Sequence, residues 1–316
     1  MKLATKHASI LASAIVALGM STSALANNIS NYTTIFDTDF TSAAVGLRNT
    51  GTGTLTVTGV AGPVTQSYLF WHGPTNSSDP NANANVTVNG TGVTGTNIGF
   101  SQDNFWGHTN SQAYRASTTS IINGNGAYAL TNFNKPGGTD VNGAATAVFF
   151  NDGNTANNRD VVIFNGNDSN FVSPFDPAGW NATLSGINYS GGSAFLTLLV
   201  SDGQNFSASD DGTLRINGVA IATGGLFQGT APGESVGNGT LFDTVTFDIT
   251  SFLTIGANSL NITLDDGFFD ALSLVALLVD LPAGAAPPID GVPEPETIAL
   301  LATGLLGLGL MRRRRR

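Results

Sequence analysis

Polar and apolar residues alternate along short stretches of this chain, which is the pattern of strands with one buried face. Residues 54–58 read Thr-Leu-Thr-Val-Thr, and residues 241–250 alternate in the same way. Denser apolar runs at 67–71 and 195–200 predict strands that are buried on both sides. The body of the chain shows no convincing amphipathic helix. The pattern therefore predicts an all-β fold made of many short strands.

Two Asn-Gly pairs predict tight hairpins. Asn89-Gly90 and Asn217-Gly218 each follow three strand-like residues. Asn and Gly tolerate the positive φ angles that a two-residue hairpin turn requires. Many short strands joined by such turns favour a β-sandwich or jelly roll.

The chain resembles itself at an offset of about 128 residues, which predicts a tandem duplication. We expect two sandwich or jelly-roll-like units of about 125 residues, at 27–160 and 161–281. The alternative is one large β domain in which Gly/Thr/Asn-rich sequence aligns by chance. Six segment pairs support the duplication: 35–37 with 163–165, 55–59 with 182–186, 68–70 with 195–197, 88–90 with 216–218, 126–130 with 256–260, and 147–150 with 274–277.

Composition agrees with this fold. Charged residues make up 11% of the chain, against roughly 25% in soluble domains, and Gly, Asn, Thr and Ser replace them. The chain has no Cys, so its stability must come from core burial or bound metal. The apolar content of 41% argues against disorder.

The first 26 residues predict a secretory signal peptide. Lys2 and Lys6 form a basic start, residues 10–19 are apolar, and the small residues Ala24 and Ala26 precede the expected cleavage point. Signal peptidase would then cut after Ala26. The alternative, an N-terminal anchor, would need a longer apolar run.

The end of the chain reads as a linker at 282–292 followed by a tail at 293–316. The tail has a Pro293-Glu294-Pro295 start and an apolar stretch at 297–311. That stretch predicts a short hydrophobic helix of roughly 22 Å, against roughly 30 Å of bilayer hydrocarbon. A basic cluster follows and should stay on the cytoplasmic side: Arg312, Arg313, Arg314, Arg315 and Arg316.

This tail resembles the PEP-CTERM sorting signal, in which a Pro-Glu-Pro motif precedes an apolar helix and a terminal Arg cluster. The resemblance implies recognition by exosortase in a Gram-negative bacterium that makes exopolysaccharide. It also implies transient anchoring in the inner membrane, cleavage near the motif and release to the cell surface. An ordinary C-terminal anchor is the alternative.

The body has looser resemblances. Residues 68–71, 86–90, 114–116 and 159–162 resemble β-sandwich modules of bacterial surface proteins. Residues 210–218 and 247–253 are similar to jelly-roll carbohydrate-binding modules. These motifs bear on fold more than on function.

Charge restricts the partners. The formal net charge is −10, and removal of both ends leaves five basic and 20 acidic residues, a charge near −15. An acidic body argues against nucleic acid and anionic membranes as partners of the body. It favours divalent cations.

Catalytic groups are scarce, so we expect no enzyme. His72 and His108 carry no zinc-motif spacing, and the chain has no Cys nucleophile and no Gly-x-Ser-x-Gly turn. The hydrolase alternative needs a carboxylate pair with one raised pKa, and no such pair is evident.

Asp-Gly loops are the candidate metal site. Carboxylates and carbonyls in Gly-rich loops suit Ca²⁺, although such loops also simply make turns. The candidate ligands are Asp202, Asp210, Asp211, Asp265, Asp266 and Asp270. Trp106 and Trp180, in Gly- and Pro-rich stretches, are candidates for contact with a sugar, whereas Trp71 is expected in the core.

The sequence thus predicts an exported, non-catalytic surface or matrix protein with a structural or adhesive role in exopolysaccharide. A Ca²⁺-dependent, lectin-like carbohydrate-binding protein is the alternative.

Overall fold

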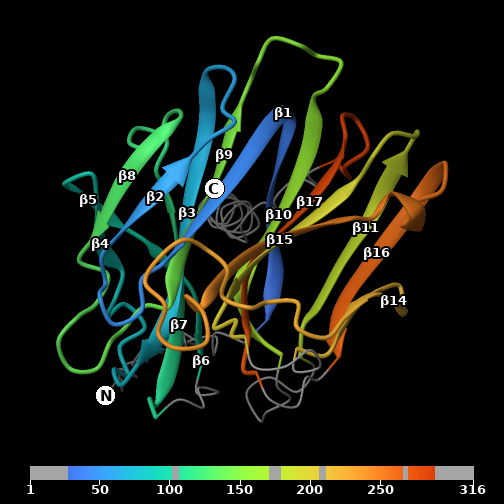
Figure 1. Ribbon diagram of the computed structural model, residues 1–316. Coiled ribbons are helices and arrows are strands. Elements are labelled where there is room, and N and C mark those ends of the chain that lie inside the picture. The colour runs from blue at the N-terminus through green and yellow to red at the C-terminus, as the bar shows by residue number, and fades with distance from the viewer. Residues whose placement is uncertain (1–27, 102–106, 171–178, 206–210, 266–269, 289–316) are drawn as a thin grey trace, which may run out of the picture.

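A computed structural model describes residues 28–101, 107–170, 179–205, 211–265 and 270–288. These residues form three antiparallel sheets, which confirms the all-β prediction (Figure 1). The expected C-terminal helix lies outside the described residues. Within the described part, no helix is long and apolar enough to cross a membrane.

The central sheet has nine strands, and two outer sheets have four each. In spatial order the central sheet is β15 (Phe242–Asp248), β12 (Phe195–Ser201), β17 (Ser273–Pro282), β10 (Arg159–Ser169), β1 (Ile29–Gly46), β9 (Gly143–Phe150), β3 (Val64–Thr75), β7 (Asn110–Ser117) and β6 (Thr96–Ser101). The first outer sheet is β2 (Gly53–Val57), β8 (Gly126–Thr131), β4 (Asn85–Val88) and β5 (Thr91–Thr94). The second outer sheet is β11 (Asn181–Tyr189), β16 (Gly256–Asp265), β13 (Thr213–Ile216) and β14 (Val219–Thr223), and a 3₁₀ turn spans Thr250–Phe252.

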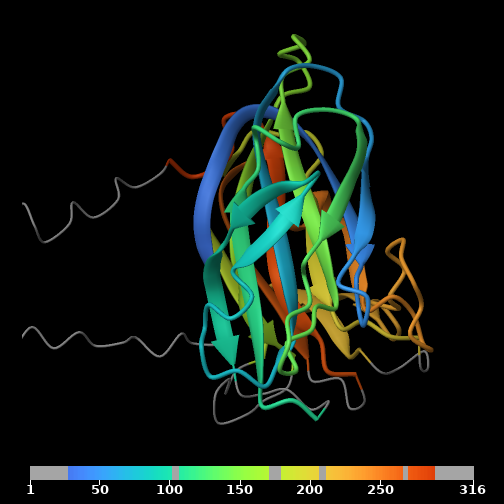
Figure 2. The same cartoon turned by 90° about the vertical axis from the view of Figure 1, so that its left-hand side faces the viewer.

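Strand β1 belongs to both halves of the central sheet. Its residues 29–38 pair with β10, and its residues 39–46 pair with β9. A bulge at the change of partner contains Asp37, whose φ of 54° is unusual for a residue with a side chain. The bend lets the two halves of the central sheet face each other, so the molecule has four layers (Figures 1 and 2).

Three apolar cores lie between the four layers. The first outer sheet packs on its half of the central sheet around Trp71 and Tyr114, and the second packs on the other half around Leu198 and Leu260. The middle core joins the two halves of the central sheet and includes Phe149. Burial on both faces of the central sheet explains the dense apolar runs of β3 and β12.

The two halves of the chain repeat one topology. The outer sheets run β2-β8-β4-β5 and β11-β16-β13-β14, and the central sheet reads outward from β1 and β10 in matching order. All six segment pairs found in the sequence fall on equivalent strands. For β8 and β16 the sequence alignment is wrong by two residues. It matches Leu130 with Leu260, but Val88 pairs with Leu130 where the equivalent Ile216 pairs with Ile262.

Division of the chain into two separate domains stays a prediction. The expected boundary after residue 160 falls inside β10, and the central sheet spans both halves. Strand β6 has no counterpart in the second half, where residues 224–241 form a loop in its place. That loop crosses to the first half, since Gly46 N donates a 2.8 Å hydrogen bond to Pro232 O.

Both Asn-Gly pairs form the expected tight turns. The φ angles are 47° and 76° at Asn89-Gly90 and 50° and 79° at Asn217-Gly218. Each Asn side chain also accepts a backbone N–H from the neighbouring strand, at 2.7 Å from Ala129 and 2.8 Å from Asn261. The turns therefore fix both the hairpin and its neighbour.

Candidate functional site

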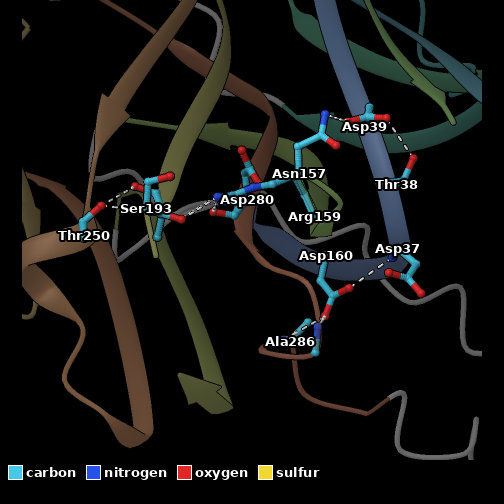
Figure 3. Close-up of polar contacts among 12 residues, drawn as sticks. Asp37, Thr38, Asp39, Asn157, Arg159, Asp160, Ser193, Thr250, Asp280 and Ala286 are labelled. Carbon is cyan, nitrogen blue, oxygen red and sulfur yellow. Dashed lines mark hydrogen bonds and ion pairs between the residues drawn. The ribbon is translucent and has the colours of Figure 1, made fainter. Parts of the chain in front are cut away.

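The last described segment of the chain lies beside a buried carboxylate. Asp160, 1% exposed at the start of β10, accepts hydrogen bonds from the N–H groups of Gly284 at 2.7 Å and Ala286 at 3.2 Å (Figure 3). It also accepts the N–H of Asp37, in the bulge of β1, at 3.2 Å. Asp160 thus holds the bend of β1 and the last described segment together.

Residues 283–286 belong to the body rather than to a linker. Ala285 and Ala286 are buried in the core beneath the second outer sheet, which contains β11 and β16. Asn188 N donates a 2.9 Å hydrogen bond to Ala285 O. Residues 282–286, which the sequence assigned to a linker, are therefore attached to the body. Proline, alanine and glycine suggested a spacer, but small apolar residues can also pack tightly.

A hollow of about 750 Å³ lies next to this last described segment. Its walls come from the loop before β10, the loop before β12 and the end of β17. Arg159 Nε lies 2.5 Å from Asp280 Oδ1, and Arg159 Nη2 donates a 2.6 Å hydrogen bond to Ser193 O (Figure 3). Burial raises the pKa of Asp280, and the bond from Arg159 opposes that shift.

The loop before β10 is held by side-chain amides and carboxylates. Asn157 Nδ2 donates to Asp39 Oδ1 at 3.1 Å and to Asp152 Oδ2 at 3.0 Å. Asp39 Oδ2 accepts the N–H of Asp152 at 3.1 Å. These contacts fix the loop against the second part of β1, so one wall of the hollow is rigid.

The candidate calcium ligands are partly described. Asp202, Asp211 and Asp270 are buried, with exposures of 7%, 0% and 0%. Asp210 and Asp266 lie outside the described residues, as does the side chain of Asp265. No group of three or more His, Cys, Asp or Glu side chains suited to a metal occurs in the described part of the chain.

Two of these carboxylates organise neighbouring loops. Asp211 accepts the N–H groups of Leu226 and Phe227, the latter at 2.7 Å. Asp270 Oδ2 accepts the N–H of Gln204 at 2.9 Å, which brings Asp270 to the Asp202 loop. The structure therefore joins Asp270 to the Asp202 loop, while the Asp211 contacts go to the loop after β14.

Trp180, which the sequence offered as a candidate sugar contact, has its ring inside the protein. Trp180 is 2% exposed in the core beneath the second outer sheet, and its ring centroid lies 5.5 Å from that of Phe227. A ring so covered presents no face to a sugar. Trp106 lies outside the described residues. Trp71 is buried as expected, with Nε1 donating to Asn83 O at 3.0 Å.

The two histidines have different surroundings and different hydrogen-bond partners. His72 is 3% exposed between the halves, with Nδ1 2.6 Å from Ser201 Oγ, and burial lowers its pKa to about 3. His108 Nδ1 is 3.2 Å from Gly138 O. His72 is therefore a neutral side chain packed between the two halves of the molecule.

Sequence reasoning missed Asn158, Asp160 and Asp280 as site residues. Asn158 and Asp160 are close in the chain, but Asp280 lies more than 100 residues from both, and the pairing of β10 with β17 brings it to them. One usable signal existed: Arg159 is among five basic residues in the body, and a rare charge at the start of an apolar strand needs a partner.

The fold defines this molecule as a four-layered, all-β protein, which fits a bacterial surface module. A family model for the PEP-CTERM protein-sorting motif matches residues 291–316. A search of curated proteins found no match. The chain carries a PEP-CTERM sorting signal and is an extracellular, cell-surface protein processed by an exosortase.

Proposed function

We propose that this protein is a non-catalytic structural or adhesive component of an exopolysaccharide matrix. The sorting motif at 291–316 is the observation that carries the proposal, because it assigns the chain to exosortase processing. The body supports a mechanical role, since three cores hold four layers together. Buried carboxylates such as Asp160 and Asp243 accept backbone N–H groups, which supports a structural use of these acids.

The proposed route begins with signal-peptide cleavage after Ala26 in a Gram-negative cell. The apolar stretch 297–311 then holds the chain in the inner membrane, with Arg312–Arg316 on the cytoplasmic side. Exosortase cuts near Pro293-Glu294-Pro295 and releases the body.

Two measurements test this proposal in the producing bacterium. Replacement of Arg312–Arg316 by Ser should leave unprocessed protein and reduce the amount on the cell surface, whereas Arg215→Ser in the body should not. The released body should co-sediment with the bacterium's own exopolysaccharide. Normal surface display of the Arg-replaced chain, or a body that stays in the supernatant, would contradict the proposal.

A second candidate is Ca²⁺-dependent carbohydrate binding. The contact between Asp270 and the Asp202 loop favours it, because it joins two acidic loops at one place. Under this alternative, Ca²⁺ should raise the melting temperature relative to EDTA, and EDTA should abolish co-sedimentation. Identical melting curves in both buffers would remove it.

A further inference from the structure

Arg115 is a cation in an acidic body, and the body supplies it with no acid. The body carries five basic and 20 acidic residues. Arg48 is paired with Asp140. Arg159 is paired with Asp280. Among the described residues, no carboxylate forms an ion pair with Arg115, and the titratable groups that influence its pKa are two tyrosines. Its charge is therefore available to an anion from outside the chain.

Arg115 lies where the two halves of the molecule face each other. It follows Ala113 by two residues on β7, so both side chains lie on one face of that strand. Ala113 belongs to the middle core, which joins the halves. Arg115 Nη1 donates a hydrogen bond to Asn165 Oδ1 on β10, in the other half of the central sheet. The surroundings of this guanidinium are therefore complete only when both halves are assembled.

Two tyrosines fix the position of the guanidinium. Tyr32 lies at a shift of register in β1 between Asn31 and Thr33, and such bulges redirect side chains. The Cζ atom of Arg115 lies 3.3 Å from the centre of the Tyr32 ring. The Tyr32 ring meets the ring of Tyr68 edge-on, with centroids 5.6 Å apart. Burial raises the pKa of Tyr68 to about 12, so this phenol is neutral and does not compensate the charge of Arg115.

The guanidinium and the ring are both open to a ligand. Tyr32 is 38% exposed. Arg115 is half-buried, and among the described residues none of its side-chain nitrogens is a buried atom without a partner. The N–H groups that Asn165 does not take are therefore at the surface. Burial lowers the pKa of Arg115, because its charge is partly removed from water. A ligand can thus reach a preorganised cation and an aromatic ring together.

We propose that Arg115 and Tyr32 bind a uronic-acid residue, whose carboxylate accepts hydrogen bonds from the guanidinium beside the Tyr32 ring. Arginine donates to carboxylates through two parallel N–H groups, which gives this contact both strength and a defined geometry. A tyrosine ring offers apolar surface with a polar tip, which suits the C–H groups and hydroxyls of the same sugar. The inference deepens the proposed matrix role by naming a ligand class and a site, and in that respect it rests on that role.

The negative charge of the body does not prevent this contact. The net charge of the body is near −15, but salt screens exposed charges beyond about 8 Å at physiological ionic strength. No carboxylate of the described residues influences the pKa of Arg115, so the local charge at the site is positive. Short acidic oligosaccharides carry few charges and are therefore the suitable probes.

The test uses the full-length chain in mild detergent, and calorimetry measures binding. The probes are trisaccharides of galacturonic, glucuronic and mannuronic acid. Trisaccharides of galactose, glucose and mannose are the matched ligands, because each carries a hydroxymethyl group in place of the carboxylate. Arg115→Gln removes the cation, and Tyr32→Ser removes the exposed ring. Arg215→Gln, on β13, is the control because it changes the net charge equally. Melting curves check that each variant folds.

We expect at least one acidic trisaccharide to bind, at least about tenfold more tightly than its neutral counterpart. Arg115→Gln should reduce its affinity by at least about tenfold, Tyr32→Ser should reduce it several-fold, and Arg215→Gln should leave it unchanged. No binding of any acidic trisaccharide, equal binding of acidic and neutral ligands, or equal losses for Arg115→Gln and Arg215→Gln would overturn the proposal. If Arg115→Gln does not fold, undiminished binding by Tyr32→Ser overturns it.

Co-sedimentation with exopolysaccharide separates this proposal from the matrix role. An Arg115→Gln body that co-sediments as efficiently as the unchanged body would leave the matrix role intact and exclude this site as its contact. Binding of an acidic trisaccharide by a body that does not co-sediment would support the site and contradict the matrix role.

Discussion

A single carboxylate, Asp160, joins three parts of the chain that are far apart in sequence. Its three backbone donors lie in β1 and in the segment after β17. Hydrogen bonds to a charged group contribute more than neutral ones, and buried donors left without partners are costly. One side chain therefore links β1, β10 and the segment after β17.

Asp160→Ala should lower the free energy of unfolding by about 2 kcal/mol, because it removes three hydrogen bonds to a buried carboxylate and leaves the N–H of the buried Ala286 unpaired. Asp152→Ala is the matched control, since that carboxylate lies on an exposed loop nearby and should have a much smaller effect. Urea unfolding measures both. Equal effects of the two substitutions would show that the Asp160 contacts contribute little.

Protonation of His72 gives a pH-dependence with a definite sign. The pKa of His72 is about 3 in the folded protein, against 6.5 in the unfolded chain. Burial lowers the folded value because it disfavours the charged ring, and Arg48 adds to that effect. Below pH 6.5 the unfolded chain binds a proton that the folded chain does not, so stability falls as pH falls toward 3.

His72→Gln should remove this contribution. Between pH 6.5 and 5 the unchanged protein should lose about 2 kcal/mol more than the variant, at about 1.4 kcal/mol per pH unit. Urea unfolding at both pH values measures the difference. Parallel pH profiles of the two proteins would mean that His72 can be charged in the folded state.

At the scale of elements, the two Asn-Gly turns isolate the effect of backbone conformation. A Cβ added at Gly90 or Gly218 meets nothing within 4 Å, but both residues have positive φ angles. Gly90→Ala and Gly218→Ala should each cost about 1–2 kcal/mol from strain alone. Gly92→Ala, which also meets nothing and has no positive φ, should be neutral or slightly stabilising. Melting temperatures distinguish these outcomes, and a loss at Gly92 as large as at Gly90 would contradict the argument.

The local elements could be predicted from sequence, but their assembly could not. Alternation located β2, and Asn-Gly located both hairpins, because these signals depend on neighbours in the chain. The shared strand β1 was not foreseen, since its change of partner depends on a bulge at Asp37. The burial of Trp180 was also missed, because composition around a residue does not reveal which layer will cover it.

At the scale of the whole molecule, the middle core couples the two halves. Gly46 illustrates how closely they approach, because a Cβ there would lie 2.4 Å from Thr240 O. Residues from β3, β9, β10 and β12 share this core. The halves should therefore unfold together.

Hydrogen exchange tests this coupling. The slowest amides of β3 and of β12 should have the same opening free energy, and Gly46→Ala should lower both by about 1–3 kcal/mol through overpacking. Gly124→Ala should change neither, because a Cβ there meets nothing within 4 Å. Different opening energies for β3 and β12 would show that the halves unfold independently.

The antiparallel pairing of the equivalent strands β1 and β10 has the geometry of a two-fold symmetric dimer contained in one chain. Two separate copies meeting in this way would dissociate as their concentration fell. Covalent linkage makes the association intramolecular, so its strength no longer depends on dilution. A protein released into the open volume outside a cell can thus keep its paired form, with the joining strand edges sealed against other molecules.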